Sequence, residues 1–235
     1  MTTKTITRVI TTLVLMPQLM FAGEIKSQKK KTTHAAFDII RTAITTEGNI
    51  AKFEIEVSGK AGSEKPKKNG KFAGAKVFSY VWPTSIDPSE VGFETKSGIL
   101  ALAVTIHPDF NDTPLFENDG SKWHTHWVVL TPDEACGSKG MKVKDIPDGV
   151  KPKLPKTWPG VPLYIDSPGY HPQFSQKTVS VKVPFDNIAA VESAKFDGVT
   201  SGLRINESVH APLLCIENIF KVASGDLSLP GKVKN

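Results

Sequence analysis

Asn49-Ile-Ala-Lys-Phe-Glu-Ile-Glu-Val57 is the stretch that decides the fold class of this chain. From Phe53 onward its apolar residues alternate with charged ones, which is typical of a β-strand with one buried face. The preceding segment, 36–44, is also rich in strand-forming residues, and Thr-Thr-Glu-Gly separates the two. The pair therefore predicts a β-hairpin.

Working outward, the same signals predict strands at 76–82, 98–107, 123–131, 178–185, 203–208 and 212–222. Segments 98–107 and 123–131 are the most apolar and are expected to lie centrally in a sheet. No long helical periodicity is visible, although 186–195 fits either a short helix or a continued strand. We predict an all-β fold, an antiparallel β-sandwich of immunoglobulin-like or jelly-roll-like type, with a closed barrel as second choice.

The chain begins with features of an export signal over residues 1–22. Lys4 and Arg8 give a positive start, an apolar run follows, and Ala22 offers a small residue for cleavage. Thr11 and Pro17 lie within that run, so a membrane span is not expected. A flexible polar leader is expected over 23–35 and a single β-sandwich domain over 36–235, in a periplasmic or secreted protein.

Residues 137–175 are expected to form a long proline-rich loop inserted in this domain. They contain seven prolines and several glycines, which disfavour regular strands and helices. They also contain aromatic residues, which a disordered linker usually lacks. We therefore expect an ordered loop that covers part of the domain.

The charge of the chain gives little support for a nucleic-acid partner. The formal charge is +5, and removal of residues 1–22 takes away two of 29 basic residues and none of 24 acidic ones, which leaves +3. The basic residues gather at 26–31 and 60–71 without the interleaved aromatics that stack on bases. These clusters are typical of solvated surface.

Cys136 and Cys215 are the two cysteines of the sequence. In an oxidising compartment an even pair is expected to form a disulfide, which would tie the middle of the chain to its last long strand. Unlinked thiols or soft metal ligands are the alternatives. The wide separation and the lack of a Cys-x-x-Cys spacing argue against a closed zinc site.

The segment Trp123-His-Thr-His-Trp127 carries the clearest chemical signal. Alternate residues of a strand lie on one face, so the imidazoles of His124 and His126 point the same way. His107 ends the preceding strand and joins that face if it pairs with His124, whereas a one-residue slip places it beside Trp123 instead.

Three imidazoles with an open coordination position suit copper or zinc, and they make a transition metal the leading predicted ligand. The alternative is structural: the histidines line a polar strand face and hydrogen-bond to loop carbonyls. The His-x-His pattern resembles the first motif of the cupin family, but Trp127 and the residues after it replace the expected glutamate. The resemblance therefore implies no function.

The loop between the two central strands is rich in carboxylates. A solvated, turn-rich loop is the favoured interpretation, and the alternatives are a second shell around a metal or a set of calcium ligands. The residues concerned are Asp109, Asp112, Glu117 and Asp119.

A second functional hypothesis places ligand recognition in the proline-rich loop. Trp158, Tyr164 and Tyr170, together with His171, could form an aromatic platform for a glycan or a peptide, with structural histidines elsewhere. A row of solvent-facing rings would favour this interpretation over metal binding. The sequence shows no nucleophile elbow, phosphate-binding loop or general base beside the histidines, so a binding protein is favoured over an enzyme.

Overall fold

The computed structural model describes residues 23–67, 74–107, 122–137, 140–205 and 214–235. Nearly all regular structure in these ranges is antiparallel β-sheet, so the predicted fold class is confirmed. The predicted signal at 1–22 lies outside the described residues and stays a prediction. No helix in the described ranges is long and apolar enough to cross a membrane.

The first sheet has five strands in the order β1-β2-β3-β10-β9. Its strands are β1 (Glu24–Lys26), β2 (Ile39–Glu47), β3 (Ile50–Val57), β10 (Thr178–Pro184) and β9 (Gln173–Ser175). The predicted hairpin is β2–β3, and Gly48 takes the positive φ of 57° that its tight turn requires. The leader predicted to be flexible over 23–35 includes β1, which pairs with β2.

The second sheet has seven strands. They are β4 (Lys76–Pro83), β5 (Ile99–Ile106), β6 (His124–Pro132), β7 (Met141–Val143), β8 (Ile165–Asp166), β12 (Val199–Ile205) and β13 (Leu214–Val222). The order is β5-β4-β12-β13-β7-β6-β8, and a further pairing of β5 with β6 closes six of the strands into a barrel. The closed barrel that we placed second in the sequence analysis therefore describes this sheet.

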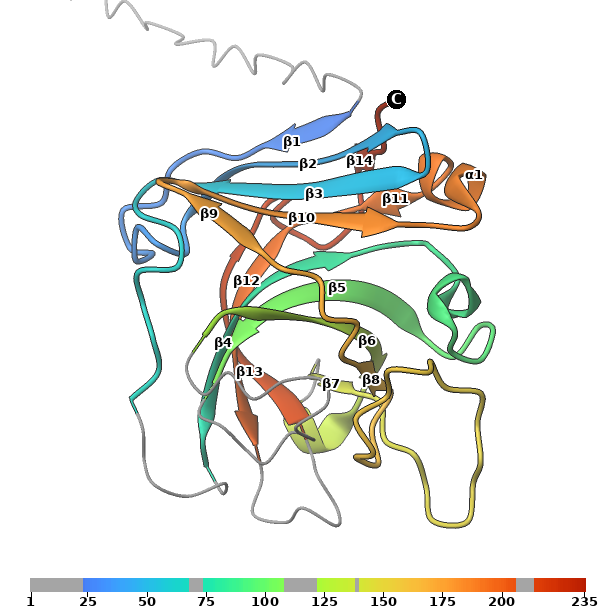
Figure 1. The fold of residues 1–235 in the computed structure, drawn as a ribbon. Helices are drawn as coiled ribbons and strands as arrows, with labels where there is room; N and C mark the ends of the chain where they lie inside the picture. Colours follow the sequence, from blue (N-terminus) through green and yellow to red (C-terminus); the bar gives the residue numbers. More distant parts are fainter. Residues whose placement is uncertain (1–22, 68–73, 108–121, 138–139, 206–213) are drawn as a thin grey trace, which may run out of the picture.

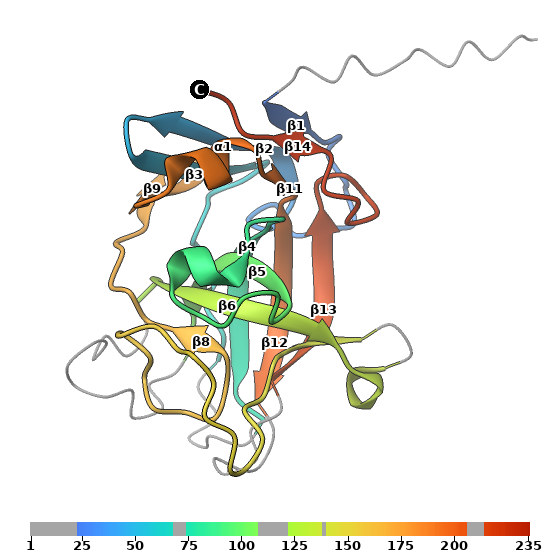
Figure 2. The ribbon, with the colours of Figure 1, turned by 90° about the vertical axis from the view of Figure 1, so that its right-hand side faces the viewer.

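The five-stranded sheet lies across one side of the barrel (Figure 1). Seen from the side, β12 and β13 run away from that sheet while β6 crosses them (Figure 2). The remaining elements are short: α1 (Ile188–Glu192), the 3-10 turns Pro88–Val91 and Glu134–Cys136, and the pair β11 (Lys195–Phe196) and β14 (Gly231–Lys232). The ambiguous segment 186–195 thus contains a five-residue helix.

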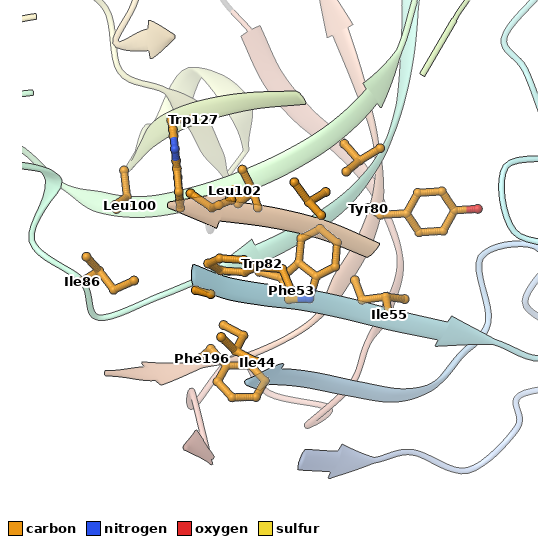
Figure 3. Close-up of a cluster of buried hydrophobic side chains, with 14 of the residues drawn as sticks. Ile44, Phe53, Ile55, Tyr80, Trp82, Ile86, Leu100, Leu102, Trp127 and Phe196 are labelled. Atoms are coloured by element: carbon orange, nitrogen blue, oxygen red, sulfur yellow. The ribbon is translucent and has the colours of Figure 1, made fainter. Parts of the chain in front are cut away.

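The main hydrophobic core fills the space between the sheet and the barrel (Figure 3). Phe53 of β3 is fully buried, and its ring lies edge-on to Trp82 of β4 and Trp127 of β6, with centroids 5.9 Å away in both cases. Leu100 and Leu102 of β5 enter the same core. Period-two alternation therefore gives each contributing strand one face for this interface.

The other face of β5 points into the barrel. Ala101 and Ala103 pack there with Val81 of β4 and with Val128 and Leu130 of β6, in a second buried cluster. β5 is thus buried on both faces, as its continuous apolar sequence predicts. Its lumen side carries small residues, which leaves room inside the barrel.

The proline-rich segment 137–175 is mostly irregular, but it contains three short strands, β7, β8 and β9. Each fits between prolines: β8, for example, lies between Pro162 and Pro168. Proline cannot donate to a β-ladder, and none of these three strands contains a proline. The expectation of no regular strand here was too strict.

Cys136 and Cys215 form the predicted disulfide, with a sequence separation of 79 residues and a Cα–Cα distance of 5.5 Å. It links the 3-10 turn after β6 to β13, on the opposite side of β7. The bond therefore ties together the part of the barrel where β7, with only three residues, bridges two long strands.

We expect the double substitution Cys136→Ser and Cys215→Ser to lower the free energy of unfolding by about 2–4 kcal/mol, because the unfolded chain gains the entropy of a long open loop. Urea unfolding of the disulfide-bonded wild-type protein and of the double variant measures the difference. A reductant should destabilise the wild-type protein and leave the double variant unchanged. If reductant does not change the urea midpoint of the wild-type protein, the disulfide does not stabilise the fold.

Candidate metal centre

The pairing of β5 with β6 positions the three predicted histidines. In the structure Thr105 lies opposite His124 and Ala103 lies opposite His126. The register that we expected places His107 opposite His124, so it is wrong by two residues. A two-residue shift preserves the face on which every side chain lies, and the three imidazoles still converge.

The three imidazoles form a compact, buried group. His107, His124 and His126 are 8%, 5% and 5% exposed, and each offers a ring nitrogen within 4.8 Å of the other two. Nε2 of His124 lies 2.8 Å from Nε2 of His107. In a tetrahedral zinc site the ligand nitrogens are about 3.3 Å apart, so small side-chain adjustments would let all three reach one ion.

Backbone carbonyls orient two of the rings from behind. The oxygen of Lys122 lies 3.0 Å from Nδ1 of His124, and the oxygen of Asp166 in β8 lies 3.2 Å from Nδ1 of His126. The Ser167 hydroxyl is also 3.1 Å from Nδ1 of His126. Metal-binding histidines usually hold their second nitrogen in this way, which fixes both ring orientation and tautomer.

Burial keeps the rings of His124 and His126 neutral. It lowers the pKa of His124 from 6.5 to about 3, reinforced by the neighbouring His107, while the Lys122 carbonyl acts in the opposite direction. Burial also lowers the pKa of His126 well below its ordinary value, with further contributions from His124 and His107. Desolvation penalises the charged imidazolium form, so neither ring holds a second proton near neutral pH.

The tautomers follow from these contacts. A carbonyl oxygen can only accept a hydrogen bond, so Nδ1 of His124 and Nδ1 of His126 each carry the ring's proton. A neutral ring has one N–H, and Nε2 of each ring therefore presents a lone pair. The resulting arrangement, with two lone pairs directed from a buried, uncharged strand face, can ligate a metal ion.

Asp166 is a site residue that the sequence analysis missed. It is 3% exposed, and burial raises the pKa of its carboxyl to about 6 even though Thr157 donates a 2.6 Å hydrogen bond to it. Its backbone carbonyl, not its carboxylate, faces His126. The short Ile-Asp strand between two prolines was the available signal, but nothing local shows that it pairs with β6.

The four carboxylates predicted as a second shell or a calcium site, Asp109, Asp112, Glu117 and Asp119, lie outside the described residues. Both roles therefore stay predictions, as does calcium binding itself.

The structure does not arrange the predicted aromatic platform as an exposed row. Tyr164 is 3% exposed and lies beneath the Lys144 ammonium, 4.6 Å from the ring centre. Trp158 is half-buried and donates through Nε1 to the Leu163 carbonyl at 3.1 Å. Tyr170 is also half-buried, and His171 alone of this set is exposed.

Comparison of the sequence with protein-family models gives no match, and comparisons with curated proteins and with solved structures give none either. The case for a function therefore rests on the geometry of the three histidines.

The lowered pKa of His124 makes the stability of the metal-free protein depend on pH. The pKa of His124 is near 6.5 in the unfolded chain and about 3 in the folded one. The stability that depends on neutral His124 is therefore complete above pH 6.5 and is lost as the pH falls towards 3. When the pH is lowered from 7 to 5, we expect the free energy of unfolding of His124→Gln to fall by about 2 kcal/mol less than that of the wild-type protein.

Urea unfolding in the presence of a chelator at both pH values measures this effect. Asp166, whose raised pKa of about 6 gives the opposite pH dependence, is common to the two proteins and cancels in the comparison. Equal losses of stability in wild type and variant would show that His124 is not held neutral by the fold.

Proposed function

We propose that this protein is an exported metal-binding protein that holds one divalent copper or zinc ion through His107, His124 and His126. The observation that carries the proposal is the convergence of three buried imidazoles whose ring nitrogens lie within 4.8 Å of one another. One nitrogen from each ring would give a divalent ion three histidine ligands, which is a known protein ligand set for zinc with an open fourth position.

The ligand set favours a borderline metal. Imidazole nitrogen suits zinc and divalent copper, whereas monovalent copper prefers thiolates and thioethers. Both cysteines are consumed by the disulfide. Met141 pairs with Pro132 at the opposite end of β6 from His124, too far along the strand to join the histidines.

Export is supported by the disulfide and by the sequence of residues 1–22. Disulfides persist in oxidising compartments such as the periplasm and the extracellular space. In such a compartment a protein without free thiols can bind copper or zinc through nitrogen ligands while its cysteines remain oxidised.

Metal binding is tested with protein purified without a histidine tag. We expect metal analysis to find one zinc or copper ion per chain after dialysis against either metal, and a hundredfold excess over the dissociation constant to stabilise the fold by about 2.7 kcal/mol. The spectrum of the copper-loaded protein should report nitrogen ligands.

The substitution His126→Gln is expected to weaken binding by more than about a hundredfold, because it removes one of three ligands while retaining a polar side chain of similar size. His171→Gln is the matched control, since His171 is an exposed loop residue, and it should bind metal as the wild type does. Equal metal affinity in both variants, or no thermal shift in the wild type, would refute the proposal.

A further inference from the structure

The lumen of the barrel contains a cavity of about 160 Å³ that reaches the histidine cluster. His107 and His126 form part of its wall, and Val81, Val128, Leu130 and Val143 are among the apolar residues that line the rest. None of the described lining residues has an acidic or basic side chain other than these two histidines. The candidate metal centre therefore opens onto an apolar chamber.

Small residues in the barrel wall create this space. Ala103 lies directly opposite His126, and Ser79 and Ser201 face the lumen from β4 and β12. The two serine hydroxyls lie 2.8 Å apart and hydrogen-bond to each other, and Ser79 Oγ also lies 3.1 Å from the Ser201 carbonyl. Because these hydroxyls satisfy each other, the wall they form needs no polar ligand.

The hydroxyl of Thr105 differs from those of Ser79 and Ser201 because it is unsatisfied within the described part of the chain. Thr105 is 7% exposed, it lines the cavity beside the histidines, and its hydroxyl has no hydrogen-bond partner among the described residues. An unsatisfied buried hydroxyl costs stability, and such groups often identify the place where a ligand atom binds. The one unsatisfied hydroxyl on the described cavity wall therefore lies at its histidine end.

The size of the chamber limits its occupant. An apolar cavity of about 150 Å³ in another protein stays dry and binds benzene, so 160 Å³ accommodates a ring or a chain of about six carbons. A second cavity of about 180 Å³ shares Val81, Leu130, Ser201 and Ile216 with the first, but the exposed Ile99 and Ile219 place part of its lining at the surface.

Charge favours an anionic head group. A divalent ion held by three neutral imidazoles keeps its full double charge in a poorly solvated site, and a carboxylate oxygen is a normal fourth ligand for zinc. One carboxylate would neutralise half of that charge and could accept a hydrogen bond from the Thr105 hydroxyl.

We propose that the barrel lumen binds a small apolar monocarboxylate, with its hydrocarbon tail among the valines and leucines and its carboxylate on the metal and the Thr105 hydroxyl. This inference rests on the proposed metal site. It assigns the open coordination position to a ligand with a tail of up to about six carbons.

Calorimetry with the zinc-loaded protein tests the inference, with hexanoate and acetate as probes. Burial of a methylene group strengthens binding roughly fourfold, and hexanoate has four more than acetate, so it should bind about two hundredfold more tightly. Hexan-1-ol has a tail of the same length without the charge and should bind at least tenfold more weakly than hexanoate.

Two substitutions locate the ligand. Val143→Phe fills the lumen opposite Leu130, four residues along β6 from His126, and should abolish hexanoate binding while zinc affinity stays within about twofold of wild type. Val150→Phe, the same change at a residue that is 50% exposed, is the matched control and should bind zinc and hexanoate as the wild type does. Thr105→Val keeps the side-chain shape and should weaken hexanoate binding about tenfold, with zinc affinity unchanged.

The outcomes separate this inference from the metal site. Failure of zinc to bind overturns both. Zinc binding combined with equal affinities for acetate and hexanoate, or with hexanol as tight as hexanoate, overturns the monocarboxylate ligand alone. If Val143→Phe does not fold, the Thr105→Val variant and the acetate comparison in wild type still decide the question.

Discussion

The antiparallel pairing of β5 with β6 is the contact on which the rest of the molecule depends. It closes the second sheet into a barrel, and without it the sheet would be open between its first and sixth strands. The same pairing gives both strands two buried faces with different tasks. Trp127 and Leu102 face the five-stranded sheet, while His126 and Ala103 face the barrel lumen.

Alternation explains why the tryptophans and the histidines of Trp123–Trp127 do not compete for one role. Trp127 is 1% exposed and packs against Phe53, and Trp123 is half-buried against Tyr80 and Phe174. These large side chains anchor β6 to the core, which holds the intervening imidazoles on the opposite face. A rigid strand is a better support for converging ligands than a loop.

The long strands, the disulfide and the shared face of the histidines could be predicted from the sequence, because each depends on a local pattern or on a single possible pair. The register of β5 against β6 could not. Hydrophobic alternation distinguishes odd from even shifts, but Leu102 meets an apolar partner whether it lies opposite Trp127 or Val129. Barrel closure and the pairing of Asp166 with Trp127 are long-range contacts that no local pattern encodes.

The two-residue difference in register matters for the chemistry. In the observed pairing Ala103 lies opposite His126, so the smallest available side chain faces a buried imidazole, and His107 lies one residue beyond the end of β5. Freed from the ladder, His107 can bring its ring to within 4.6 Å of His124 and 6.2 Å of His126, measured between centroids. In the expected pairing the bulkier Thr105 would face His126, and His107 would be held by the strand. In the observed register His107 can therefore reach the other two histidines, and the small Ala103 leaves space in the lumen beside them.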